Sequence, residues 1–235
     1  MIAASAASPT ETPASAIRIN PNAMAGINTH ALVLDWFRGK SGVVADVGAG
    51  LGALSVELAR LGFDVRACDR DRDAFRAHGV ANIRFEPADL DVALPFGDSS
   101  VDFACAIEVI EHLENPRHLM RECRRILRDG GTVVLSTPNI LNVVSHLTLL
   151  SRGSLIYFSQ KEYASNHHIT PVSLQDFQNI CAEVGFEIVR VDYNAGKLPI
   201  PKVRHWLPLL GRPFRNRWLG ESLMVWATKT RRRDR

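Results

Sequence analysis

The 235-residue chain lacks the features of a secreted or membrane-spanning protein. No hydrophobic run approaches the roughly 18 residues that a membrane-spanning helix needs. Residues 1–16 are rich in Ala, Ser, Thr and Pro, and they have neither the basic start nor the continuous hydrophobic stretch of a secretory signal. We therefore expect a cytoplasmic protein in which residues 1–22 form a disordered leader.

Cysteine is also scarce. The four cysteines show no Cys-x-x-Cys spacing, and Cys68 and Cys105 lie inside hydrophobic segments that are typical of buried strands. This distribution favours reduced thiols in the core of the protein over disulfides.

The excess of positive charge is small when the C-terminal residues are left out of the count. The net charge is +3, and Arg231, Arg232, Arg233 and Arg235 contribute four positive charges. The remainder is close to neutral, so we expect no nucleic-acid partner. A hydrophobic content of 46% suits one core. We predict one domain over residues 23–229 and a basic tail over 230–235, which is either a solvated terminus or a contact with acidic lipid or nucleic acid.

What the sequence does contain is a glycine-rich loop between a strand and a helix. The segment 43–47 is hydrophobic and rich in β-branched residues, Gly48, Gly50 and Gly52 follow at alternate positions, and 54–61 is compatible with a helix. Alternate glycines let a ligand approach the backbone, and the free N–H groups at the start of a helix favour an electron-rich partner. The loop therefore predicts a nucleotide-type pocket.

Strands and helices alternate along most of the chain, which predicts a mainly parallel sheet with its ligand at the carboxyl ends of the strands. Two insertions interrupt the alternation, at 140–171 and 194–220. Both are expected on the side of the pocket that would bind a second molecule, the acceptor. The second mixes Pro, Trp and Arg residues, and it either recognises an anionic acceptor, lies at a membrane surface, or packs on the sheet edge. The predicted strands are 43–47, 63–68, 82–86, 101–109, 132–136, 186–193 and 222–228, and the predicted helices are 23–37, 54–61, 71–78, 116–127, 140–150 and 173–184.

Several motifs in order resemble the class I S-adenosylmethionine-dependent methyltransferases, in particular the group of ubiquinone-biosynthesis-type O-methyltransferases. The motifs are the loop Asp46–Gly52, Asp69, the segment 88–90, the segment 108–113 and the Gly-Gly pair 130–131 before the fifth strand. The resemblance covers residues 43–228. It implies an α/β, Rossmann-like, doubly wound sheet of seven strands with an antiparallel last strand, helices on both faces and an insertion after strand five.

The glycine loop also satisfies the dinucleotide fingerprint G-x-G-x-x-G/A, which by itself is a weak signal. The acidic Asp46 before the first glycine, the 88–90 segment and the Gly-Gly pair favour the methyl donor instead. An NAD(P)-dependent oxidoreductase is therefore the alternative, and a protein that binds the cofactor without catalysis is a third.

The resemblance assigns S-adenosylmethionine as cofactor, with S-adenosylhomocysteine as product, and places it along the loop. Asp46 would organise the loop, Asp69 would bind the ribose hydroxyls, and Glu108 would lie beneath the sulfonium. The remaining expected cofactor contacts are Gly48, Ala49, Gly50 and Gly52 on the methionine part, and Arg70, Asp89 and Leu90 around the adenine.

Methyl transfer is an in-line displacement that often needs a base, and His112 and His168 are the candidate catalytic residues. His112 can instead be structural. Glu108, Glu111 and His112 lie at i, i+3 and i+4, a spacing that could also bind a divalent cation, although no metal is our first expectation. The candidate substrate contacts are His30, Tyr163, His167 and His168. We expect O-methylation of a small molecule or of a glycan or lipid-linked intermediate, with peripheral membrane contact allowed.

Overall fold

The computed structural model describes residues 12–17, 19, 28–195 and 215–230, and the following elements are those of this part of the chain. The strands are β1 (Val43–Val47), β2 (Asp64–Asp69), β3 (Ile83–Pro87), β4 (Val101–Ile107), β5 (Leu127–Pro138), β6 (Phe186–Tyr193) and β7 (Ser222–Lys229). The α-helices are α1 (Thr29–Phe37), α2 (Ala53–Arg60), α3 (Pro116–Ile126), α4 (Val143–Arg152), α5 (Gln160–Asn166) and α6 (Leu174–Val184). Short 3-10 turns are η1 (Ala14–Ala16), η2 (Ile110–His112) and η3 (Ile156–Phe158).

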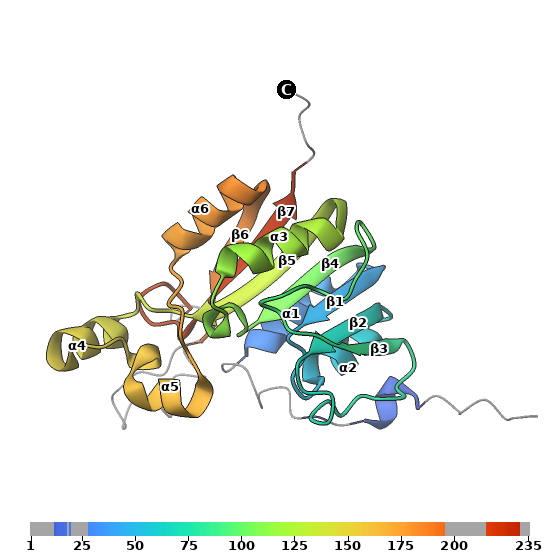
Figure 1. Ribbon diagram of the computed structural model, residues 1–235, viewed down its shortest axis with the longest axis horizontal. Coiled ribbons are helices and arrows are strands. Elements are labelled where there is room, and N and C mark those ends of the chain that lie inside the picture. The colour runs from blue at the N-terminus through green and yellow to red at the C-terminus, as the bar shows by residue number, and fades with distance from the viewer. Residues whose placement is uncertain (1–11, 18, 20–27, 196–214, 231–235) are drawn as a thin grey trace, which may run out of the picture.

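The seven strands form one sheet in the order β3-β2-β1-β4-β5-β7-β6 (Figure 1). The pairs β1–β2, β2–β3, β1–β4 and β4–β5 are parallel, whereas β7 is antiparallel to both β5 and β6. The order reverses between β1 and β4, so the ends of these two strands open a crevice for a ligand. The predicted fold class, including the antiparallel last strand, is confirmed.

Each face of the sheet buries its own hydrophobic layer. On one face, α3 and α6 place side chains such as Leu119 and Phe177 against the sheet. On the other, α1 and α2 contribute Val33, Phe37 and Leu58. Because both faces are covered, the central strands are hydrophobic on both sides, as parallel sheets require. All four cysteines are buried and free, as expected.

Two predicted elements are wrong. Residues 71–78 form turns in place of a helix, because the Asp71 carboxylate accepts the backbone N–H groups of Asp73 and Ala74 and so competes with helical hydrogen bonding. The fifth strand begins at Leu127, directly after α3, and not after the Gly-Gly pair. A shift in register opposite Val101 and Phe103 accommodates Gly130 and Gly131 inside the strand.

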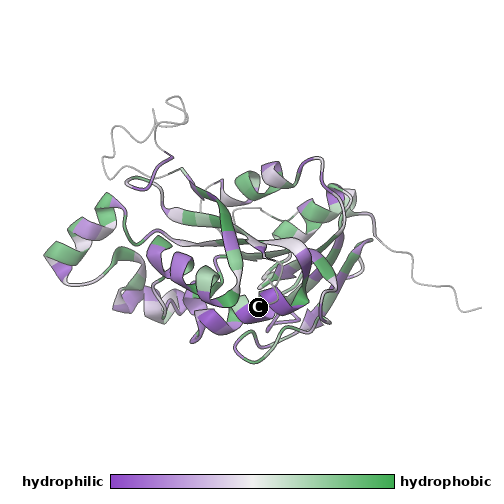
Figure 2. Ribbon diagram, turned by 90° about the horizontal axis from the view of Figure 1, so that it is seen from above, coloured by the Kyte–Doolittle hydropathy of each residue, from purple (hydrophilic) through white to green (hydrophobic). Residues whose placement is uncertain are grey.

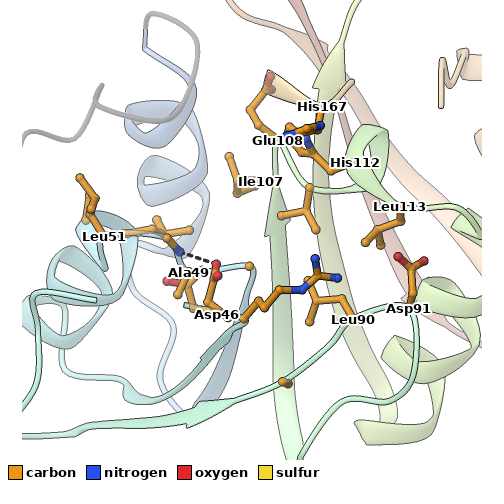
Figure 3. Close-up of a pocket in the computed structure, with 18 of the residues that line it drawn as sticks. Asp46, Ala49, Leu51, Leu90, Asp91, Ile107, Glu108, His112, Leu113 and His167 are labelled. Carbon is orange, nitrogen blue, oxygen red and sulfur yellow. Dashed lines mark hydrogen bonds between the residues drawn. The ribbon is translucent and has the colours of Figure 1, made fainter. Parts of the chain in front are cut away.

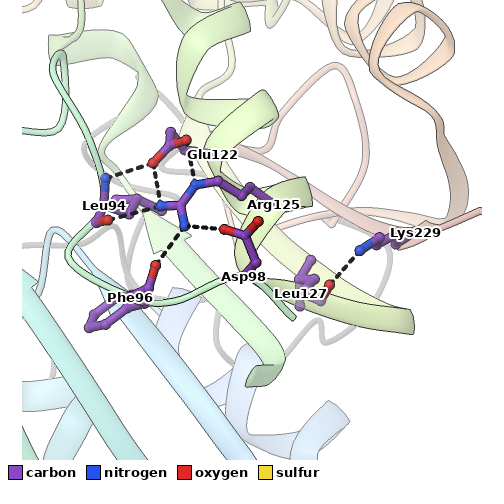
Figure 4. A network of polar contacts seen from close by, with 7 residues as sticks. All are labelled: Leu94, Phe96, Asp98, Glu122, Arg125, Leu127 and Lys229. Carbon is purple, nitrogen blue, oxygen red and sulfur yellow. Dashed lines mark hydrogen bonds and ion pairs between the residues drawn. The ribbon is translucent and has the colours of Figure 1, made fainter. Parts of the chain in front are cut away.

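An arginine network fixes the long loop between β3 and β4 (Figure 4). The Arg125 guanidinium donates to the carbonyls of Leu94 and Phe96 at 3.0 and 2.7 Å and pairs with Asp98 and Glu122. Glu122 in turn accepts the Leu94 N–H at 2.9 Å. The network anchors the loop on α3, and the first part of that loop lines the cavity described below.

The insertion after β5 contains α4, η3 and α5, which lie beyond the carboxyl ends of the strands (Figure 1). In Figure 2, α4 at the left carries hydrophobic residues although it lies outside the sheet core. Its exposed hydrophobic side chains include Leu147 and Leu150, the latter 85% exposed. None of the described helices has the length and apolar character to cross a bilayer. Most of the predicted leader, of the second insertion with Trp206, and of the basic tail lies outside the described residues.

Candidate active site

The glycine loop lies where β1 ends, and its shape depends on glycine. Gly48 has a φ of +72°, and a Cβ there would lie 2.5 Å from Cγ2 of Val109. The N–H groups of Gly48 and Ala49 both donate to the Cys68 carbonyl at the end of β2, at 2.8 and 3.0 Å. The Gly50 N–H donates to the Asp69 carboxylate at 2.8 Å. The loop is therefore tied to β2 before any ligand arrives.

Asp46 lies beneath this loop, fully enclosed in β1. Its carboxylate accepts a hydrogen bond from the Ser55 hydroxyl of α2 at 2.5 Å, which joins the strand to the helix across the loop. Burial raises the pKa of Asp46 to about 6. This geometry supports the expectation that Asp46 organises the loop.

Replacing Asp46 with Asn is expected to stabilise the protein at neutral pH but not in acid. The native state holds a proton on Asp46 up to a pKa of about 6, whereas the unfolded chain releases it near 4. As pH rises from about 4 to about 7, wild type therefore loses roughly 2 kcal/mol of stability that the Asp46→Asn variant does not lose. Denaturant unfolding of both proteins at the two pH values measures this. An identical stability difference at both would contradict it.

A cavity of about 380 Å³ extends from the loop along the ends of β1, β2 and β4 (Figure 3). Of the expected cofactor residues it is lined by Asp46, Gly48, Ala49, Gly50, Asp69, Arg70, Leu90 and Glu108. Gly52 does not line it; with a φ of +84° it begins α2 and packs under Phe75. The volume is in the range of small-molecule sites.

After β3, the acidic residue that lines the cavity is not the predicted one. Asp89 pairs with Arg70 at 3.1 Å and does not line the cavity. Asp91, two residues later, lines it together with Leu90. Both acids follow the same strand, so the sequence located the segment but not which carboxylate faces the ligand.

Glu108 follows β4 in a left-handed conformation with a φ of +54°. Its N–H group and its carboxylate both bond to the Ser136 hydroxyl of β5, the carboxylate accepting at 2.7 Å. Burial raises the pKa of Glu108, partly offset by this hydrogen bond. Because Glu108 lies outside the 3-10 turn that follows, it does not join Glu111 and His112 in one set as the i, i+3, i+4 spacing suggested.

His168, and not Glu108, forms a cluster with Glu111 and His112. Ligand atoms of Glu111, His112 and His168 all lie within 4.8 Å of one another. The Glu111 side chain is fully buried, and neither carboxylate oxygen has a well-formed hydrogen bond among the described residues, although the buried Thr137 hydroxyl lies close by. Burial, and then the nearby Glu108, raise the pKa of Glu111. Burial, and then His168, lower the pKa of His112.

Backbone contacts bring His168 from the insertion to this place. The N–H groups of Ile169 and Thr170 both donate to the Glu111 carbonyl, at 2.9 and 3.0 Å. Nδ1 of His168 lies 2.8 Å from the Tyr157 carbonyl, and since a carbonyl only accepts, Nδ1 carries the hydrogen and Nε2 keeps its lone pair. The rings of His112 and His168 pack edge to face, with their centroids 4.8 Å apart.

Of the expected substrate residues, two line the cavity and two do not. His167 and His30 line the cavity, and Figure 3 shows His167 beside His112 and Glu108. Tyr163, which is 56% exposed, and His168 do not line it. Asp91, Val109 and Leu113 also line the cavity and were not expected to; the two hydrophobic residues carry no distinct sequence signal.

Comparison with known proteins identifies the family. A family model described as a methyltransferase domain matches residues 24–191. The ubiquinone biosynthesis O-methyltransferase of Paraburkholderia phymatum is 31% identical over 189 residues, which cover 75% of this chain and 76% of that protein. The enzyme of the same name from Cupriavidus pinatubonensis is 34% identical over 119 residues, which cover 47% of that protein. The match to the enzyme of the same name from Caulobacter sp. covers 40% of that protein.

Solved structures share the fold. An S-adenosylmethionine-dependent methyltransferase from Mesorhizobium loti superposes with a TM-score of 0.60 at 19% identity, over 84% of this chain and 96% of that one. Another from Archaeoglobus fulgidus gives 0.59 at 16% identity, over 86% and 95%. The choice between S-adenosylmethionine and a dinucleotide is thus decided for S-adenosylmethionine. The chain belongs to the class I S-adenosylmethionine-dependent methyltransferases.

Proposed function

We propose that the protein methylates a hydroxyl group of a small aromatic, lipid-linked acceptor. The observation that carries this proposal is the cluster of Glu111, His112 and His168, of which His112 lines the cavity together with Glu108. A hydroxyl is a weak nucleophile until its proton is removed, and the cluster supplies imidazole nitrogens for this purpose. The name shared by the curated relatives supports a ubiquinone-type precursor as acceptor.

In the proposed reaction, the acceptor oxygen attacks the methyl carbon as the carbon–sulfur bond breaks, and the bonding pair stays on sulfur. The proton of the hydroxyl passes to a nitrogen of the histidine pair. His112 suits this role because it lines the cavity, and the ring of His168, oriented by the contact of its Nδ1 with the Tyr157 carbonyl, packs edge to face against it. The glycine loop and Asp69 would hold the donor so that methyl and oxygen are aligned.

The same three side chains also fit a divalent cation. Two imidazoles and one carboxylate are a common ligand set, and the Glu111 carboxylate is otherwise buried without a well-formed hydrogen bond among the described residues. The contact of His168 with Tyr157 is the type of outer contact that orients a metal-binding histidine. When bound, such an ion lowers the pKa of a hydroxyl that coordinates it.

The exposed hydrophobic side of α4 supports a lipid-linked acceptor. Leu147 and Leu150 are 58% and 85% exposed, and Trp218, 49% exposed, lies at the base of the helix, where its carbonyl accepts the Val143 N–H. The stretch from 139 to 159 contains Arg152 but no acidic residue. The helix α4 contacts η3, whose Tyr157 carbonyl lies against His168, and a hydrophobic, non-acidic helix in this place suits an isoprenoid tail or the membrane that holds it.

Replacing Leu147 and Leu150 together with Ser is expected to lower kcat/KM several-fold for a catechol that carries an isoprenoid tail. The same change should leave kcat/KM for the tail-less catechol as in wild type, because the reacting end does not reach α4. Leu61→Ser, at the end of α2, removes an exposed leucine away from α4 as control. Equal rates on both acceptors in all variants would exclude the lipid-linked class while leaving methyl transfer itself intact.

A further inference from the structure

His30 is a buried histidine that lines the cavity, and one of its ring nitrogens has no hydrogen-bond partner among the described residues. The residue is 7% exposed, and the nitrogen in question is Nδ1. Burial lowers its pKa to about 4. A neutral imidazole with an unsatisfied nitrogen is costly to bury unless a ligand completes its hydrogen bonds.

Packing places His30 at the methionine end of the expected cofactor position. One turn further along α1, Val33 packs with Val44 and Leu58, and Ala49 of the glycine loop lies against the same cluster. The preceding residue, Thr29, lies 3.4 Å from the Asn194 side chain, which also bonds to Ser222 at the start of β7. The first turn of α1 therefore lies between the glycine loop and the start of β7.

The charges around the cavity show what His30 can contact. Four carboxylates line it, those of Asp46, Asp69, Asp91 and Glu108. Among the described lining residues, the side-chain N–H donors are Arg70, His112, His167 and His30. Arg70 pairs with Asp89 near β3, and His112 and His167 lie at the acceptor end. His30 is thus the side-chain donor available beside the glycine loop.

We propose that His30 donates a hydrogen bond to the α-carboxylate of S-adenosylmethionine. The amino acid part of the cofactor carries this carboxylate, and an anion placed near so many carboxylates needs a nitrogen donor of its own. The inference moves His30 from the acceptor, where the sequence placed it, to the cofactor. It rests on the cofactor alone, so it stands or falls independently of the lipid-linked acceptor.

Calorimetric binding of two ligands tests this assignment. The ligands are S-adenosylhomocysteine and its decarboxylated analogue, which lacks only the α-carboxylate. His30→Ala should weaken S-adenosylhomocysteine about 10- to 100-fold, the range for a hydrogen bond to a charged group. The same variant should bind the analogue as wild type does. His30→Gln keeps an N–H donor and should recover part of the affinity.

His118→Ala serves as the matched control, since His118 lies on α3 and contacts the Val92 carbonyl outside the cavity. An equal loss of both ligands in His30→Ala would overturn the proposal and indicate a structural role. Unchanged S-adenosylhomocysteine affinity with a raised KM for the acceptor would also overturn it, and would return His30 to the acceptor side. If the Ala variant does not fold, the Gln variant should show a smaller loss of S-adenosylhomocysteine affinity and no loss for the analogue, and an equal loss of both ligands would again overturn the proposal.

Discussion

Glu111→Gln is expected to lower the rate of methyl transfer by at least about 100-fold, the usual contribution of a group that helps remove a proton in the transition state. The change preserves shape and removes only the carboxylate that lies within reach of His112 and His168. S-adenosylhomocysteine affinity should stay at the wild-type value, because Glu111 does not line the cavity. Stopped assays with saturating cofactor measure the rate, and calorimetry measures the affinity.

Stability distinguishes this loss from misfolding. Burial raises the pKa of Glu111, so ionising it costs the native state free energy as pH rises, and a neutral Gln removes that cost. The variant should therefore be at least as stable as wild type at neutral pH. Glu114→Gln, an exposed glutamate three positions later, is the control and should retain full activity. A Glu111→Gln enzyme with wild-type turnover would show that the Glu111 carboxylate takes no part in the mechanism.

Metal analysis of the same variant separates the two roles of the cluster. If a divalent cation is bound, it should copurify with wild type, be absent from Glu111→Gln, and EDTA should abolish wild-type activity. If the histidine pair acts as a base alone, wild type should retain activity in EDTA and contain no stoichiometric metal.

Gly48→Ala is expected to abolish cofactor binding and to destabilise the protein by about 2 to 4 kcal/mol, the sum of a left-handed φ for a non-glycine residue and overpacking. Its Cβ would lie 2.5 Å from Val109 Cγ2, and the loop cannot retreat because Gly48 and Ala49 are bonded to the Cys68 carbonyl. Either the loop or Val109 must move into the cavity that both line.

Gly79→Ala is a closely matched control. Gly79 has the same φ of +72°, but nothing lies within 4 Å of a Cβ built there. The Gly79→Ala change should lower the free energy of unfolding by about 1 to 2 kcal/mol through backbone conformation alone, and it should leave cofactor affinity unchanged. Adding Val109→Ala to Gly48→Ala should restore part of the lost stability. Equal unfolding free energies for the Gly48 and Gly79 variants would show that the contact with Val109 is unimportant.

The sequence predicted those parts of the site that depend on neighbouring residues. The glycine spacing, Asp46 before it and Asp69 after the next strand follow from the local strand-loop-helix pattern, and the structure places Asp46, Asp69 and the first two glycines around one cavity. It did not predict that His168 meets Glu111, because that contact depends on how the insertion after β5 folds back on η2. No local periodicity encodes such a long-range contact.

The errors within elements have physical causes. The 108–112 spacing suggested one helical face, but Glu108 adopts a left-handed conformation and bonds to Ser136 of β5, so the helix geometry does not reach it. Residues 71–78 contain helix-compatible residues, yet local side-chain hydrogen bonds at Asp71 give turns. In both cases a side-chain contact outweighs propensity.

The most direct test of the account follows an isotope-labelled methyl group from S-adenosylmethionine to a catechol with an isoprenoid tail, with NMR to locate it in the product. We predict a new methyl ether on one ring oxygen, formed by wild type and lost in Glu111→Gln. Transfer to nitrogen or carbon, or no transfer to any hydroxylated acceptor by an enzyme that binds S-adenosylhomocysteine, would contradict the proposed function.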